Sequence, residues 1–149
     1  MRILSGLKTI GRSSWRDKAL LAEAGFVLVL ASIAIRLVPF KRIAQVASAP
    51  TGRLLPQEER LPEIRRIRWA VVAWADRVPW RAMCFERGLS VHWMIRRRGV
   101  PSIMHYGAVL DPDEGLLAHV WIKDGDVPII GCESESRFRL LASFPGTPA

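Results

Sequence analysis

The hydrophobic periodicity of the chain changes at Gly99, and this change limits the folds that the sequence can adopt. Before Gly99, apolar residues recur at steps of three and four, as they do on one face of a helix. After it, short apolar runs are separated by turn residues at 111–115 and 124–126, a pattern typical of antiparallel strands. Helices followed by an antiparallel meander predict an α+β domain.

The helices can be placed from their start and stop signals. Ser14 and Asp17 form a capping-box pattern at the start of a first helix, which should end before Pro39. A loop over residues 48–62 leads to Pro62, which fits the first position of another helix. Gly99 fits the left-handed residue that closes a helix. The expected helices are residues 15–37, a short one ending at Ala47, residues 62–78 and residues 81–98.

The second half should form a small sheet. Strands are expected over residues 100–110, 116–123 and 127–131, with one more short element around 138–141. The Asp124-Gly125-Asp126 turn should join the second and third strands as a hairpin.

Length and composition limit the class of protein. A chain of 149 residues is most simply one domain, residues 1–149, with a helical part over 1–61 and a core over 62–149. Its net charge of +8 favours an acidic partner. Nucleic acid is not the expected partner, because the sequence has no RNA-binding signature, zinc-finger spacing or phosphate-binding glycine loop. Two distant cysteines and no secretory signal predict a cytoplasmic protein.

The longest apolar run covers residues 24–35. It is shorter than the roughly 20 residues that a membrane-spanning helix needs. We therefore expect a buried helix, and a helix that lies on a membrane surface is the alternative.

Cys84 and His119 are the candidate catalytic residues. Cys84 is expected in the first turn of a helix, where unpaired N–H groups can stabilise both a thiolate and an oxyanion. His119 lies in an apolar strand and could accept the thiol proton as a general base. Such a pair would make the protein a cysteine hydrolase or transferase.

An acid that orients the histidine would complete the site. Glu133 is the first choice, because strand alternation counted back from Gly125 puts it on the sheet face of His119. Asp111, Asp124 and Asp126 remain alternatives. A zinc site built from His92, His105 and Cys132 is less favoured, since no two of these have close ligand spacing. No cofactor or metal is expected.

Two sequence blocks carry a family resemblance. These are Pro79-Trp80-Arg81-Ala82-Met83-Cys84 and Ala118-His119-Val120-Trp121-Ile122, in this order. With the early apolar helix around Leu21-Ala22-Glu23-Ala24, they make the chain similar to the leader peptidases of lasso-peptide biosynthesis, the B maturation proteins, from about Leu20 to Glu133. The resemblance implies a transglutaminase-like, papain-like fold with a catalytic helix on a small antiparallel sheet.

The resemblance also implies a function and partners. A cysteine protease with Cys84 as nucleophile and His119 as base would cut a precursor peptide at its leader–core junction. A leader-binding protein on a separate chain would present the precursor, and an ATP-dependent cyclase would close the macrolactam. The family's usual acid falls at Gly131 here, so Glu133 is a substitute, and Phe85 replaces a common leucine.

Two other functions stay open at this point. A transglutaminase or peptide N-glycanase-like amidase would use the same cysteine and histidine on a side-chain amide. A non-catalytic membrane-associated scaffold would use the apolar helix as its interface.

Overall fold

A computed structural model describes residues 14–146 as one α+β domain. The first thirteen residues and the last three, which the single-domain prediction also covers, lie outside the described part. The helices are α2 (Trp15–Leu37), α3 (Phe40–Ala47), α4 (Gln57–Ala75), α5 (Cys84–Arg97) and the short 3₁₀ helix η1 (Cys132–Arg137). The strands are β1 (Ile103–Asp111), β2 (Gly115–Asp124), β3 (Val127–Ile130) and β4 (Arg139–Phe144).

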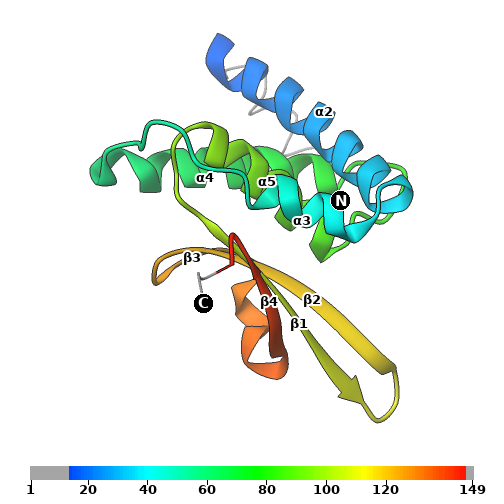
Figure 1. The fold of residues 1–149 in the computed structure, drawn as a ribbon. Coiled ribbons are helices and arrows are strands. Elements are labelled where there is room, and N and C mark those ends of the chain that lie inside the picture. Colours follow the sequence, from blue (N-terminus) through cyan, green and yellow to red (C-terminus); the bar gives the residue numbers. More distant parts are fainter. Residues whose placement is uncertain (1–13, 147–149) are drawn as a thin grey trace.

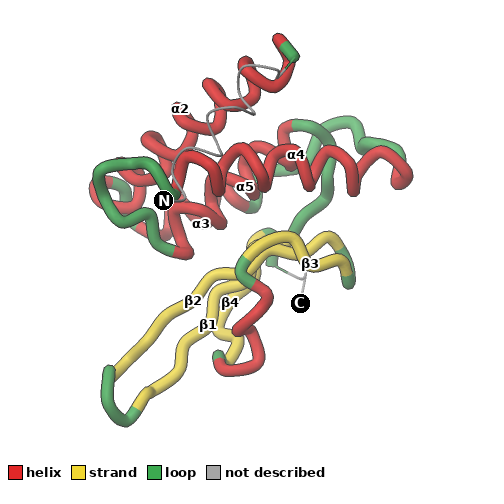
Figure 2. The backbone as a smooth tube through the Cα atoms, turned by 180° about the vertical axis from the view of Figure 1, so that it is seen from behind, coloured by secondary structure: helices red, strands yellow, loops and turns green. Residues whose placement is uncertain are grey.

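The four α-helices gather at one end of the sheet, and the β1–β2 hairpin extends away from them (Figures 1 and 2). The sheet is antiparallel, in the order β3-β2-β1-β4. The main core lies between α2, α4, α5 and the proximal part of the sheet, and includes Leu89, Ile95, Met104 and Ile122. This arrangement confirms the expected α+β class.

Helix α2 has the predicted bounds. The Ser14 hydroxyl accepts the Asp17 N–H at 3.3 Å, and the Asp17 carboxylate accepts the Ser14 N–H at 3.2 Å. One face of α2 is buried, whereas the opposite face exposes a stripe at helical spacing: Phe26, Val29, Leu30, Ile33 and Leu37. The prediction that this helix is buried therefore holds for only one face of α2. By length and composition α2 could cross a membrane, but the core helix of a soluble protein can pass the same test.

Helix α4 begins earlier than the sequence indicated. It starts at Gln57 after the N-cap Pro56, and Pro62 lies inside it. Glu58 and Glu59 in its first turn interact favourably with the positive helix end. The choice of Pro62 as the first residue was therefore wrong: Pro56 marks the boundary, and the helix continues through the second proline.

Helix α5 ends where the sequence indicated, although it begins at Cys84 instead of residue 81 and the strand expected from residue 100 begins only at Ile103. Gly99 has φ +86° and ends α5 as predicted. Gly88 lies one turn after Cys84, and a Cβ there would approach Val120 Cγ1 to 2.9 Å. This glycine lets α5 pack closely on β2, beside His119.

The last strand differs from a simple meander. β4 pairs with β1, on the side away from β2, after η1 has carried the chain across. Gly131 has φ +77° and directs the chain out of the sheet at the end of β3. The sequence carries no helix signal in Cys132–Arg137 strong enough to reveal this turn, and η1 was missed.

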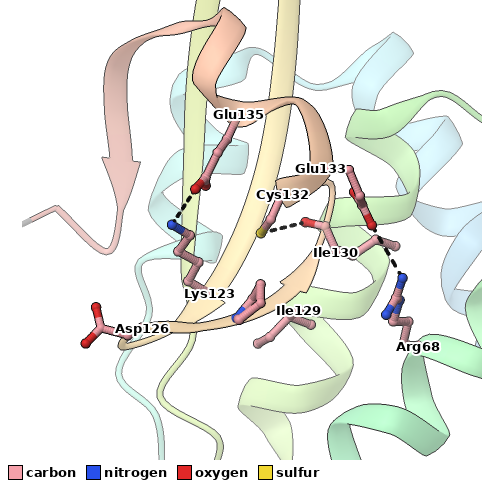
Figure 3. Close-up of a pocket in the computed structure, with 9 residues that line it drawn as sticks. Arg68, Lys123, Asp126, Ile129, Ile130, Cys132, Glu133 and Glu135 are labelled. Carbon is pink, nitrogen blue, oxygen red and sulfur yellow. Dashed lines mark hydrogen bonds and ion pairs between the residues drawn. The ribbon is translucent and has the colours of Figure 1, made fainter.

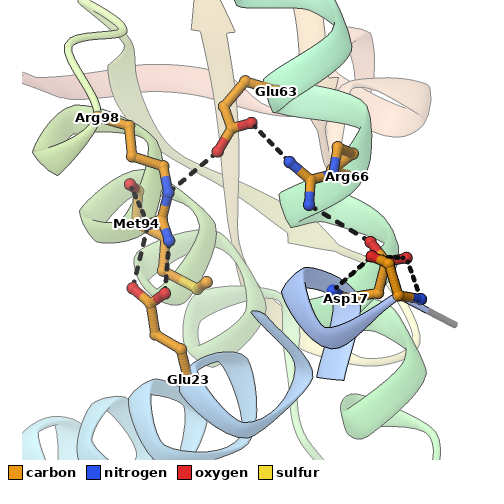
Figure 4. A network of polar contacts seen from close by, with 7 residues as sticks. Asp17, Glu23, Glu63, Arg66, Met94 and Arg98 are labelled. Atoms are coloured by element: carbon orange, nitrogen blue, oxygen red, sulfur yellow. Dashed lines mark hydrogen bonds and ion pairs between the residues drawn. The ribbon is translucent and has the colours of Figure 1, made fainter. Parts of the chain in front are cut away.

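Partly buried ion pairs join three helices (Figure 4). Arg98 at the end of α5 contacts Glu23 of α2 and, at 3.0 Å, Glu63 of α4. Glu63 also pairs with Arg66, which reaches Asp17 at 3.3 Å. The Arg98 guanidinium lowers the pKa of the Glu23 carboxyl. The arginines at the end of α5 thus have a structural role in joining the helices.

His92 should make the fold sensitive to acid. Its imidazole is buried, donates from Nε2 to the Ala47 carbonyl at 2.9 Å, and contacts the Ser102 hydroxyl through Nδ1 at 3.0 Å. Burial lowers its pKa to about 4, so between pH 6.5 and about 4 the unfolded state binds more protons than the folded state. We expect the free energy of unfolding to be fully retained above pH 6.5 and to fall by up to about 3 kcal/mol as the pH drops to 4.

Urea denaturation across this pH range measures the effect. Because other groups also titrate, the quantity to compare is the difference between wild type and His92→Gln at each pH. This difference should shrink as the pH falls through 6.5 toward 4. Parallel pH profiles for the two proteins would contradict the assignment to His92.

Candidate active site

Cys84 is the first residue of α5, and Glu86 fixes this helix end. Met83 is the N-cap, and its N–H donates to the Glu86 carboxylate at 2.5 Å. Glu86 is buried and also pairs with Arg36 of α2 at 3.2 Å. Sequence reasoning missed this residue, although a glutamate three positions after an N-cap is a known capping signal.

The segment before Cys84 is held by its own tryptophan and by an arginine of α5. Trp80 Nε1 donates to the Ser32 hydroxyl of α2 at 3.1 Å, and Arg87 Nε donates to the Ala82 carbonyl at 3.0 Å. The conspicuous Pro-Trp-Arg block therefore positions the approach to the helix. The half-buried thiol lies at the end of α5 where N–H groups lack intrahelical acceptors, so an oxyanion formed at Cys84 would meet donors there.

His119 lies in β2 and is held by a backbone carbonyl. Its Nε2 lies 2.6 Å from the Gly131 carbonyl oxygen and 3.4 Å from the Ser134 hydroxyl. The imidazole stacks on Phe138, with ring centroids 4.9 Å apart. Because a carbonyl oxygen only accepts hydrogen bonds, Nε2 carries the proton, and Nδ1 keeps the lone pair that a general base needs.

The structure brings Cys84 and His119 to one cavity. This cavity, of about 280 Å³, is lined by both residues and by Phe40, Phe85, Tyr106, Ala118 and Val120. Val120 faces α5 at Gly88, so strand alternation places the neighbouring imidazole on the other side of β2. In the described part of the chain no hydrogen bond joins the thiol to the imidazole. Proton transfer requires the thiol and the imidazole to approach more closely than they do in this structure; catalytic contacts are often loose before substrate binds.

Glu133 is not beside His119. Its side chain is 73% exposed and pairs with Arg68 of α4 at 3.5 Å (Figure 3). The alternation that predicted the contact ends at Gly131, where the chain leaves the sheet and enters η1. Glu133 instead lines a second cavity next to Cys84, of about 500 Å³. The geometry thus gives no support to Glu133 as the orienting acid.

The alternative acids are engaged elsewhere. Asp111 accepts the Asp113 N–H at 2.9 Å and pairs with Arg137, and these turn contacts lower its pKa. Asp124 pairs with Arg60 at 3.7 Å, and Asp126 is exposed. Within residues 14–146, no carboxylate is a hydrogen-bond partner of the His119 imidazole.

Gly131 occupies the place where the family's acid is expected, and it cannot carry a side chain in this conformation. A Cβ there would come within 2.5 Å of the Val120 carbonyl oxygen, and the backbone has φ +77°. The main-chain carbonyl therefore takes the position of the missing carboxylate. A neutral carbonyl can fix the tautomer and the ring plane, but it adds no charge to stabilise an imidazolium.

Replacing Glu133 by glutamine should show whether the Glu133 carboxylate or the Gly131 carbonyl orients His119. If the Gly131 carbonyl orients His119, Glu133→Gln should keep the Cys84-dependent activity within about threefold, because only an exposed ion pair is lost. Loss of a true orienting carboxylate costs several orders of magnitude of activity. Initial rates of the Cys84-dependent reaction decide between them, and a drop of about 100-fold or more would restore Glu133 as the acid.

The residues of the less favoured zinc site lie apart. His92 is buried under α3, and His105 contacts the Ser143 hydroxyl of β4 at 2.9 Å. The Cys132 thiol donates to the Ile122 carbonyl at 3.3 Å, and burial raises its pKa. Among the described residues, no cluster of three or more His, Cys, Asp or Glu side chains could hold a metal ion.

Comparison with known proteins agrees with this fold. The description "Transglutaminase-like superfamily" fits residues 26–143, which include α3, α4, α5 and the sheet as far as β4. The chain belongs to the transglutaminase-like superfamily, which generally includes cysteine peptidases and transferases. Searches of curated proteins and of solved structures gave no match.

Proposed function

We propose that this protein is a cysteine peptidase that removes the leader from a lasso-peptide precursor. The observation that carries the proposal is Cys84 at the N-terminus of α5, on a cavity shared with His119, in a chain of the transglutaminase-like superfamily. The two sequence blocks around these residues add the resemblance to leader peptidases. Superfamily membership alone supports only the wider class of cysteine hydrolases and transferases.

The chemistry follows from the positions of the groups. His119 Nδ1 takes the thiol proton, and the Cys84 sulfur attacks the carbonyl carbon of the leader's last residue. N–H groups at the start of α5 stabilise the oxyanion, and the imidazolium returns the proton to the departing amine. Water then hydrolyses the thioester. The products are the free leader and a core peptide with a free N-terminal amine.

Product masses test this reaction against the amidase alternative. The full chain is incubated with a precursor peptide and a leader-binding protein, and the products are weighed. Two fragments whose masses add up to the precursor plus one water support the peptidase. An uncut peptide in which a side-chain amide has released ammonia and gained either water or an amine in its place would overturn the proposal and favour side-chain amide chemistry.

We propose that leader recognition resides on a separate protein. Helices α2, α3 and α4 pack into the same core as α5 and the sheet, and residues 14–75 contain no strand that could pair with a leader. The freed amine would then be the substrate of an ATP-dependent cyclase, which joins it to an acidic side chain. Cytoplasmic maturation fits these partners.

The exposed apolar stripe of α2 should bind an anionic membrane surface. Helices α2 and α3 expose the cations Arg16, Lys18, Lys41 and Arg42, whereas their carboxylates Asp17 and Glu23 are ion-paired. Cationic side chains beside an apolar stripe are typical of peripheral membrane helices.

Flotation with vesicles that contain about one-third anionic lipid measures this binding. Wild type should float, and Ile33→Glu should reduce the floating fraction at least about threefold, because it puts a charge into the stripe. Leu116→Glu, which changes an exposed leucine on the sheet, is the control. Wild-type protein that stays wholly in the bottom fraction would contradict the prediction.

A further inference from the structure

The cavity shared by Cys84 and His119 is apolar and aromatic. Phe40 of α3 lies between Phe85 of α5 and Tyr106 of β1, with ring centroids 6.0 Å and 5.7 Å away. Ala118 and Val120 of β2 complete the lining. Four separate elements thus contribute to an enclosure that opens beside the thiol.

The second cavity beside Cys84 has a different chemistry. Its lining mixes apolar residues such as Val72, Met83 and Ile130 with the charged Arg68, Arg81, Arg87 and Glu133. An apolar side chain there would lie close to charged groups that prefer water. The aromatic cavity has no lysine, arginine or carboxylate among the described residues that line it and is therefore the better match for an apolar side chain.

We propose that the aromatic cavity is a specificity pocket for a large apolar side chain, aromatic or aliphatic, next to the scissile bond. This inference rests on the proposed function and names the substrate class of the same site. Burying a phenyl group there, compared with a methyl group, should favour reaction at Cys84 by about tenfold or more. Ala118 is the smallest side chain of the lining and is exposed, so the pocket can be filled from this position without disturbing the core.

Alkylation of Cys84 tests the pocket without requiring peptidase activity. N-acetyl-phenylalanyl and N-acetyl-alanyl chloromethyl ketones each form a C–S bond with the thiolate and release chloride. The rate at Cys84, read by mass spectrometry of its peptide in the full chain, should be about tenfold or more higher for the phenylalanyl reagent. Because the ratio of the two rates is measured within each protein, any general change in thiol reactivity cancels.

Filling the pocket should remove this preference. We expect Ala118→Phe to bring the ratio close to one, whereas Leu116→Phe, two residues earlier on the same strand and outside the cavity, should leave it unchanged. Phe40→Ala should also lower the ratio. Because Phe40 is 43% exposed, this variant provides the test if Ala118→Phe does not fold. A wild-type ratio near one, or a preference that survives both pocket variants, would overturn the inference.

Different results would reject the leader-peptidase proposal and the pocket proposal. A clear phenylalanyl preference with no cleavage of any precursor would keep the pocket and reject the leader peptidase. Precursor cleavage that depends on Cys84, together with a ratio near one, would keep the peptidase and reject the pocket.

Discussion

Replacing Cys84 by alanine is expected to reduce leader cleavage by at least about 1,000-fold, because the acyl intermediate forms on its thiol. The fold should be unaffected. The thiol is only half-buried, and alanine is the best helix former at an α-helical position. Cleavage is measured by mass spectrometry and folding by thermal unfolding of the same preparations.

Cys132→Ala is the matched control for this variant. Cys132 is the other cysteine, is equally half-buried, and bonds to main-chain carbonyls of the sheet without lining the Cys84 cavity. We expect it to keep its cleavage rate within about threefold, as for loss of a weak thiol hydrogen bond. Normal processing by Cys84→Ala would reject the cysteine mechanism.

Replacing His119 by alanine is expected to slow cleavage by about 100- to 10,000-fold, since the thiol loses its general base and the leaving amine its acid. The double variant Cys84→Ala/His119→Ala should be no slower than Cys84→Ala alone, because residues of one catalytic unit do not act additively. Initial rates with the same precursor measure both effects.

His105→Ala is the control for the histidine. His105 lies on β1, opposite Trp121, and its ring stacks on that tryptophan with centroids 5.6 Å apart. It resembles His119 in strand location and aromatic stacking but lies outside the Cys84 cavity. Equal losses from the two substitutions would mean that the imidazoles matter only for the sheet, and His119 would lose its role as base.

The helices could be predicted because their end signals are local. Ser14 with Asp17 fixes the start of α2, and Gly99 with positive φ fixes the end of α5. Each of these depends on a few neighbouring residues, which sequence reasoning can evaluate.

Two missed features, the pairing of β4 and the position of Glu133, depend on contacts distant in sequence, unlike the local signals missed at Pro56 and Glu86. β4 pairs with β1 only because η1 carries the chain across, and the positive φ of Gly131 starts that path. The same turn removes Glu133 from His119 and brings the Gly131 carbonyl to Nε2. Strand alternation assumed a hairpin register that pairs His119 with Gly131, but the observed ladder has an irregularity between Ile122 and Lys123 and ends at the pair Ile122–Ile130.

Trapping the acyl intermediate tests the central claim, that Cys84 attacks a backbone carbonyl, most directly. The full chain is mixed with precursor and leader-binding protein, quenched in acid within seconds, and weighed intact. We predict an added mass equal to the leader minus one water, located on Cys84 and absent from Cys84→Ala. An adduct with the mass of the whole precursor minus ammonia, or leader cleavage that continues in Cys84→Ala, would contradict the account.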